Sequence, residues 1–135
     1  MVDDIQQFNL IEIAKKSMEN AYAPYSKFKV GAAIKSKNGN VYNGCNIEIA
    51  SSTPSCCAER VAIFKAVSKG EKKFINMAIV GDTYSPISPC GVCRQVMNEF
   101  FDQNTEIYLV NLKHVIKVTN INDLLPYPFN SKRQN

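Results

Sequence analysis

The spacing of apolar residues changes along the chain between a helical and a two-residue period, and the order of these changes constrains the fold more than any other feature. Residues 9–21 carry apolar side chains at helical spacing, whereas residues 27–35 alternate apolar side chains with lysines, as a half-buried strand does. Asn38-Gly39 predicts a tight hairpin turn, since a type I′ turn needs positive φ at both central residues. We therefore expect a returning strand over residues 41–47.

The rest of the chain continues with elements of both kinds. They are predicted as helices at residues 57–70 and 90–101 and as strands at residues 74–80, 105–110 and 115–118. This order predicts a single α/β domain over residues 1–135, in which one sheet is covered by helices. Because loops at residues 49–56 and 81–89 precede the two inner helices, we expect both helix N-termini at one end of the sheet.

The composition excludes several classes of protein. Five cysteines are an odd number for a disulfide framework, and a single histidine, His114, excludes zinc sites built from two or three histidines. The net charge of +4 is mild and the basic residues are scattered, whereas a nucleic-acid binder concentrates them. No apolar run approaches the ~20 residues of a membrane span, and the acidic start lacks the cations of a signal peptide. We expect a cytoplasmic protein with reduced thiols and with neither a nucleic-acid nor a membrane partner.

Three of the cysteines stand at the starts of the two inner helices. Cys90 and Cys93 form a C-x-x-C pair, whose thiolates can converge on a tetrahedral ion, and Cys57 is the natural third ligand from the neighbouring helix. A helix N-terminus also favours the thiolate form of a cysteine. Three protein ligands leave the fourth position of a zinc ion open to water, as in catalytic sites. The pattern therefore predicts a Zn²⁺ site suited to hydrolysis.

The residues that follow Cys57 complete the predicted chemistry. Glu59 is close enough in sequence to face a zinc-activated water without binding the metal, and a carboxylate there can take and return a proton. Three thiolates on Zn²⁺ carry a net charge of −1, which a hydrogen bond from arginine to sulfur would offset. Arg60 and Arg94 both follow ligand-bearing motifs, and we favour Arg60 for this role.

Other interpretations of these residues stay open at this point. A C-x-x-C pair alone is often a redox motif, and a closed four-cysteine site would add Cys56 to the three ligands. Cys45 is expected to be a small buried side chain. If Glu59 is an ordinary acid at a helix N-terminus, the protein is a non-catalytic zinc-binding module.

The cysteine motifs belong to a wider pattern that resembles the small zinc-dependent cytidine deaminases. Cys-Ala-Glu followed by Pro-Cys-x-x-Cys is a signature of zinc nucleobase deaminases. The likeness extends over nearly the whole chain, through YAPYSKFKVGAA (22–33), GCNIE (44–48), CAER (57–60), SPCGVCRQ (88–95) and LLPYPF (124–129). It implies a three-layer α/β/α fold with a mixed five-stranded sheet, and hydrolytic deamination of cytidine and 2′-deoxycytidine in pyrimidine salvage. It also implies a homotetramer whose active sites are shared across subunit interfaces.

The resemblance assigns a role to individual residues. It implies Cys57, Cys90 and Cys93 as zinc ligands and Glu59 as the proton shuttle, with Arg60 beside the ligands. The implied substrate contacts are Phe28 against the pyrimidine, Asn46 and Glu48 on the ribose hydroxyls, Ala58, and Phe129 inserted from a neighbouring subunit. From the residues alone, Phe28 could also be plain core, and Asn46 and Glu48 an ordinary exposed strand pair.

Two positions depart from the family pattern, and two related activities compete with the leading hypothesis. Ile49 stands where the family often has Asn, and Ser52 stands where it often has Tyr; both bear on affinity and substrate range. A deaminase of a cytosine antibiotic such as blasticidin S shares the metal motifs, but Glu48 suits a free ribose hydroxyl. Editing of cytosine in nucleic acid would need a basic patch, which the scattered charges do not provide.

Overall fold

The computed structural model describes residues 3–131, which form one mixed five-stranded sheet and the helices that cover it. The elements are α1 (Asp4–Ser17), the 3₁₀ turn η1 (Met18–Asn20), β1 (Val30–Ser36), β2 (Val41–Cys45), α2 (Ala58–Ser68), β3 (Phe74–Gly81), α3 (Gly91–Phe100), β4 (Glu106–Asn111), β5 (Ile116–Thr119) and α4 (Ile121–Leu124). The strand order is β2-β1-β3-β4-β5, with β3 and β4 parallel and the other neighbours antiparallel.

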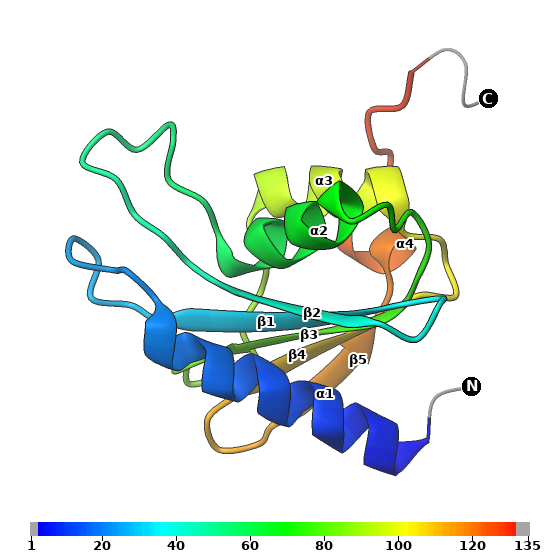
Figure 1. The fold of residues 1–135 in the computed structure, drawn as a ribbon, viewed down its shortest axis with the longest axis horizontal. Coiled ribbons are helices and arrows are strands. Elements are labelled where there is room, and N and C mark those ends of the chain that lie inside the picture. The colour runs from blue at the N-terminus through cyan, green and yellow to red at the C-terminus, as the bar shows by residue number, and fades with distance from the viewer. Residues whose placement is uncertain (1–2, 132–135) are drawn as a thin grey trace.

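Helices cover both faces of the sheet, so the molecule has three layers. Figure 1 shows α1 on one face and α2, α3 and α4 on the other. Each face has its own apolar cluster: Ala33, Val80 and Tyr108 of the sheet pack under α1, whereas Ile34 and Ile79 on the other face pack with Met97 of α3. The predicted α/β/α fold with a mixed five-stranded sheet is therefore confirmed.

Strand β1 differs from its prediction in start and in burial. The alternating pattern predicted a half-buried strand from Phe28, but β1 begins at Val30. Lys27 adopts a left-handed conformation (φ 61°), which takes the preceding segment out of the extended form that a strand requires. Because β1 lies inside the sheet and helices cover both of its faces, every residue from Val30 to Ile34 is buried.

Helix α1 is longer at its start than the apolar pattern predicted. It begins at Asp4, where the side chain of Asp3 accepts a hydrogen bond from the backbone N–H of Gln6 (2.8 Å) and so caps the first turn. Ile13, which was predicted to belong to the buried stripe, is exposed. Within the described residues, no helix is long and apolar enough to cross a membrane.

The first turn of α2 lies directly against β2 because Gly44 has no side chain. A Cβ at Gly44 would stand 2.6 Å from the backbone nitrogen of Ala62 and 2.7 Å from the carbonyl oxygen of Ala58. This close approach fixes the height of the helix above the sheet. It therefore also sets the position of Cys57, which caps α2.

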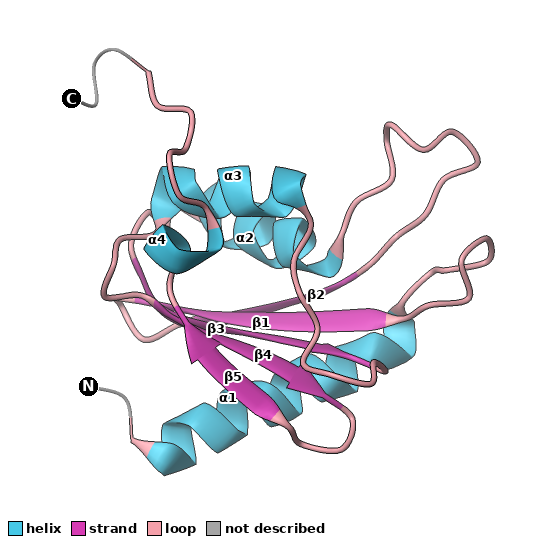
Figure 2. Ribbon diagram, turned by 180° about the vertical axis from the view of Figure 1, so that it is seen from behind, coloured by secondary structure: helices cyan, strands magenta, loops and turns pink. Residues whose placement is uncertain are grey.

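The N-termini of α2 and α3 lie at the same end of the sheet (Figure 2), as their preceding loops predicted. Figure 1 shows two further loops, residues 21–29 and 46–57, that project at this end. Residues brought from four parts of the chain can therefore meet here.

Candidate active site and metal centre

The thiols of Cys57, Cys90 and Cys93 form one compact group at the two helix N-termini. Cys57 is the N-cap of α2 and Cys90 is the N-cap of α3, while Cys93 lies in the first turn of α3. The sulfur atoms of Cys57 and Cys90 are 3.7 Å apart, those of Cys90 and Cys93 are 3.3 Å apart, and all three lie within 4.8 Å of one another. The sequence-predicted ligands are thus brought together.

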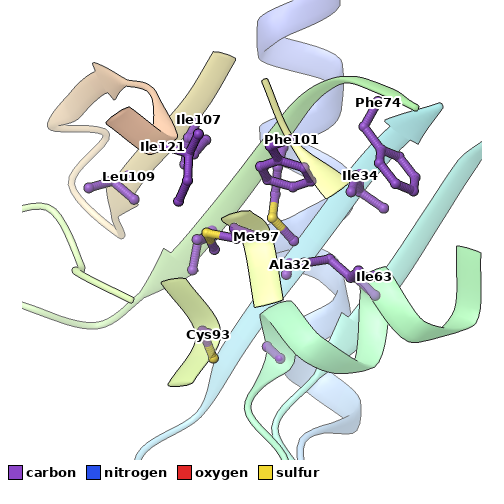
Figure 3. Close-up of a cluster of buried hydrophobic side chains, with 14 of the residues drawn as sticks. Ala32, Ile34, Ile63, Phe74, Cys93, Met97, Phe101, Ile107, Leu109 and Ile121 are labelled. Carbon is purple, nitrogen blue, oxygen red and sulfur yellow. The ribbon is translucent and has the colours of Figure 1, made fainter. Parts of the chain in front are cut away.

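The spacing and chemistry of this group fit a zinc ion. A tetrahedral ion ~2.3 Å from each sulfur holds the sulfurs ~3.8 Å apart. A hydrogen bond from Cys93 and then Arg60 lower the pKa of the Cys57 thiol to about 5, which favours its thiolate form, while the same hydrogen bond raises the pKa of Cys93. Cys93 is buried in the same apolar cluster as Ile34 and Ile79 and lies one helical turn before Met97 (Figure 3). Packing in this cluster therefore fixes the position of the Cys93 ligand.

The group contains three sulfur ligands and leaves the fourth position of a tetrahedral ion without a protein ligand. Within residues 3–131, neither Cys56 nor a carboxylate joins the three thiols. Cys56 instead pairs its backbone with Ile47, through hydrogen bonds of 2.8 and 2.9 Å. The closed four-cysteine alternative is therefore wrong, and the open arrangement is the one found in catalytic zinc sites.

Of the two arginines beside the ligands, Arg60 contacts sulfur. Its Nη2 donates a hydrogen bond to the Sγ of Cys57 (3.4 Å). Burial by itself would lower the pKa of Arg60, but hydrogen bonds to Cys57 and Cys93 outweigh it and raise the pKa. Arg94 instead donates to the backbone carbonyls of Pro89 and Leu124 and to the hydroxyl of Ser88. Arg60 is therefore placed to offset the excess negative charge of three thiolates.

Glu59 is a buried acid beside this group. Its side chain is 5% exposed, and burial raises its pKa to about 7. A carboxyl group with a pKa near neutrality can both accept and release a proton at physiological pH. This is the property that a proton shuttle needs.

Four of the five predicted substrate contacts line a cavity of about 280 Å³ that reaches Glu59, Cys57 and Cys90. Its lining consists of Ser26, Phe28, Val30, Asn46, Glu48, Cys57, Ala58, Glu59, Ile87, Ser88 and Cys90. The structure therefore brings together Phe28, Asn46, Glu48 and Ala58, which come from three separate segments of the sequence. Arg60 lies outside this cavity and lines a neighbouring one.

Ile87 and Ser26 were not predicted from the sequence. Ile87 is buried and packs over Gly81. A Cβ added to Gly81 would stand 2.5 Å from the Cδ1 of Ile87 and 3.3 Å from the Cζ of Phe28. An apolar residue in a loop gave no signal for this wall of the cavity. Ser26 and Ser88 lie inside motifs that carry the family resemblance, but no spacing in the sequence marks either serine as a cavity residue.

The side chains of Asn46 and Glu48 hold the loop that carries Phe28. Asn46 accepts a hydrogen bond from the backbone N–H of Val30 (2.9 Å) and donates one to the carbonyl of Phe28 (2.8 Å). Glu48 accepts bonds from the backbone N–H groups of Tyr25 (3.1 Å) and Ser26 (3.0 Å) and from the hydroxyl of Ser26. The two residues are thus not an ordinary exposed strand pair.

Phe129 lies away from the cavity of its own chain. Its side chain is 79% exposed, and its backbone carbonyl accepts a hydrogen bond from the Nε2 of Gln95 on α3 (2.8 Å). The structure therefore holds the backbone of Phe129 in place and leaves the ring free of the chain's own core.

Comparisons with known proteins agree with this geometry. The family model described as the cytidine and deoxycytidylate deaminase zinc-binding region matches residues 5–109, which include all three thiols. A cytidine deaminase of Sporosarcina psychrophila is 50% identical over 123 residues, which are 91% of this chain and 90% of that protein. A cytidine deaminase of Halalkalibacterium halodurans is 46% identical over 126 residues, which are 93% of this chain and 96% of that protein.

A solved structure and a more distant relative complete the comparison. The crystal structure of a cytidine deaminase from Burkholderia pseudomallei matches with a TM-score of 0.88 and 48% identity, over 90% of this chain and 98% of that one. A blasticidin-S deaminase of Bacillus cereus is 30% identical over 132 residues, 92% of each protein. Because the family model covers most of the chain and relatives reach half identity over nine-tenths of it, this chain belongs to the cytidine deaminase family of zinc-dependent hydrolases.

Proposed function

We propose that this protein hydrolyses cytidine and 2′-deoxycytidine to uridine and 2′-deoxyuridine, with release of ammonia. The observation that carries the proposal is the position of Glu59, a buried acid that lines the same cavity as Cys57 and Cys90 of the three-thiol group. The reaction consumes one water and exchanges the exocyclic amine of the base for a carbonyl oxygen.

The residues of the chain divide the chemistry between them. Cys57, Cys90 and Cys93 hold the zinc ion, which when bound supplies Lewis-acid activation of the attacking water. Glu59 would take one proton from the attacking water and deliver it to N3 of the cytosine ring as the water oxygen bonds to C4. It would then take the second proton from that oxygen and deliver it to the amino group, so that the C4–N bond breaks, ammonia leaves and C4 keeps a carbonyl oxygen. Arg60, through its bond to the Sγ of Cys57, limits the charge that the thiolates place on the site.

The remaining cavity residues orient the substrate. Phe28 and Ile87 form an apolar wall against which the pyrimidine packs, and Ala58 lines the cavity next to Glu59. Glu48 and Asn46 lie on the loop side of the cavity, where a carboxylate and an amide reach sugar hydroxyls. Substrate held in this way stays aligned with Glu59, which is the requirement for efficient proton transfer.

The proposed enzyme is a homotetramer whose subunits complete one another's active sites. The support from the structure is Phe129, whose ring is 79% exposed while Gln95 holds its backbone carbonyl. An exposed aromatic ring on a held backbone is suited to enter a neighbouring subunit's site. We place the enzyme in the cytoplasm and in pyrimidine salvage, where free nucleosides are its substrates.

The proposal is tested by following the conversion of cytidine to uridine by ultraviolet absorbance, with zinc quantified per chain. We expect turnover that scales with zinc content and a mass in solution near four times that of the 135-residue chain. A protein that binds zinc but converts neither nucleoside would refute the proposed activity. A monomer with full activity would refute the shared site.

The likeness to a blasticidin-S deaminase gives one second candidate. Both reactions replace an exocyclic amine of cytosine, so the metal centre does not separate them. The sugar-facing carboxylate of Glu48 favours a free nucleoside. Ammonia release with cytidine and blasticidin S side by side decides between them, since turnover of the antibiotic alone would overturn our assignment.

A further inference from the structure

Ser26 links two residues of the cavity that have separate proposed roles. Its hydroxyl donates a hydrogen bond to the Oε2 of Glu48 and accepts one from the backbone N–H of Phe28 (3.0 Å). Ser26 also lines the cavity. One small exposed side chain therefore joins the carboxylate proposed for the sugar to the backbone of Phe28, whose ring is proposed to contact the base.

The loop that carries Ser26 depends on such contacts for its shape. Residues 24–26 form a turn closed by a bond from the backbone N–H of Lys27 to the carbonyl of Ala23 (3.0 Å). Lys27 follows in a left-handed conformation (φ 61°), which is unfavourable for a side chain other than glycine. This conformation persists only if neighbouring contacts compensate for it.

Glu48 supplies those contacts from outside the loop. Its Oε1 accepts bonds from the backbone N–H groups of Tyr25 and Ser26, and its Oε2 accepts the hydroxyl of Ser26. The pKa of Glu48 is lowered, and the largest cause is the bond from the Ser26 hydroxyl. The carboxylate is therefore held in one orientation by the same turn that it stabilises.

We propose that Ser26 is a positioning residue that couples the orientation of Glu48 to the placement of Phe28, so that the sugar contact and the base contact form one preorganised unit. This inference rests on the proposed function, because it assigns the two contacts to the sugar and the base of one nucleoside. Preorganisation raises affinity by reducing the conformational freedom lost on binding. Ser26 contributes no proton and acts through its two neighbours.

The test compares Ser26→Ala with Ser26→Thr, which keeps the hydroxyl, in steady-state assays with cytidine. We expect Ser26→Ala to raise KM about tenfold, as loss of a hydrogen bond to a charged group would, and to leave kcat within about threefold. Ser26→Thr should restore most of the affinity. Ser68→Ala is the control, because it too removes one exposed serine hydroxyl with a hydrogen bond, here to the backbone carbonyl of Lys65 at the C-terminal end of α2, away from the cavity.

A double-mutant cycle with Glu48→Gln separates coupling from two independent effects. We expect the KM of Ser26→Ala/Glu48→Gln to rise by clearly less than the product of the two single effects. For any variant too slow to assay, the dissociation constant of uridine measured by calorimetry replaces KM. A multiplicative result would overturn the coupling.

Stability measurements distinguish positioning from a general structural role. We expect the urea midpoint of Ser26→Ala to match that of Ser68→Ala. If Ser26→Ala has a lower urea midpoint and its kcat falls by the same factor as its KM rises, the inference is overturned. An active Ser26→Ala enzyme with an unchanged KM would also overturn it. If the wild-type protein converts no cytidine at all, the proposed function fails instead, whatever the Ser26 variants show.

Discussion

Gly44→Ala should displace the helix that carries Cys57 and Glu59. The added Cβ would stand 2.6 Å from the backbone nitrogen of Ala62 and 2.7 Å from the carbonyl oxygen of Ala58, whereas ordinary contacts begin at 3.4 Å. Both clashing atoms are backbone, so no side chain can turn aside. The first turn of α2 must retreat from β2 by most of an ångström.

This retreat should lower both stability and turnover. Overpacking of a well-packed contact costs about 1–3 kcal/mol of unfolding free energy. With a typical urea dependence, the unfolding midpoint falls by roughly 0.5–1.5 M. Because Cys90 and Cys93 lie on α3, the shift also moves Glu59 and Cys57 relative to the other two ligands, and a misplacement of ~1 Å can reduce turnover about 100-fold.

The assay is urea unfolding together with kcat/KM at saturating zinc. Gly91→Ala is the matched control, since a Cβ at Gly91 meets nothing within 4 Å although it stands between two ligands. We expect this control to bind zinc and unfold as the wild type does. If Gly44→Ala keeps both its urea midpoint and its turnover, the contact between α2 and β2 does not set the geometry of the site.

Two further predictions concern the thiol group, and a third concerns Glu71, a buried acid outside the site. Arg60→Gln removes the hydrogen bond to the Sγ of Cys57 and should lower zinc affinity or kcat about 10–100-fold, measured by competition with a chelator and by turnover. Cys57→Ala should lose zinc while Cys56→Ala retains it, as metal analysis of the purified variants would show. The pKa of Glu71 is lowered to about 2, first by a hydrogen bond from Asn40, so its stabilisation is present above the unfolded value of ~4.3 and is lost as pH falls towards 2. Urea midpoints between pH 7 and pH 3 should therefore decline less in Glu71→Gln than in the wild type.

The metal centre could be predicted from the sequence because local rules determine most of it. The spacing of Cys90 and Cys93 places both thiols on one helical turn, whatever surrounds them. The position of Cys57 required one further step, that a loop before each inner helix brings both N-termini to the same end of the sheet. Arg60 and Arg94 both follow ligand-bearing motifs, and the hydrogen bond from Arg60 to the Sγ of Cys57 agrees with the preference for Arg60.

The mouth of the cavity could not be predicted, because contacts between distant segments determine it. Phe28 continues the alternation of β1, yet Lys27 turns the chain before the strand begins, and nothing in the local pattern marks that turn. Ile87 and Phe28 both lie against Gly81, although about sixty residues separate them in the sequence. Asn46 matched a family position for ribose, but its bonds to Val30 and Phe28 become visible only when β1 and the loop after β2 are placed together.

The most direct test of the account is Glu59→Gln, with zinc per chain and cytidine turnover measured on the same sample. The amide keeps the size of the side chain but cannot shuttle a proton. We expect zinc content equal to the wild type and kcat reduced about 100-fold or more, while Glu99→Gln, an exposed acid on α3, keeps full activity. Turnover retained within tenfold in a zinc-loaded Glu59→Gln protein would contradict the assignment of Glu59 as the proton shuttle.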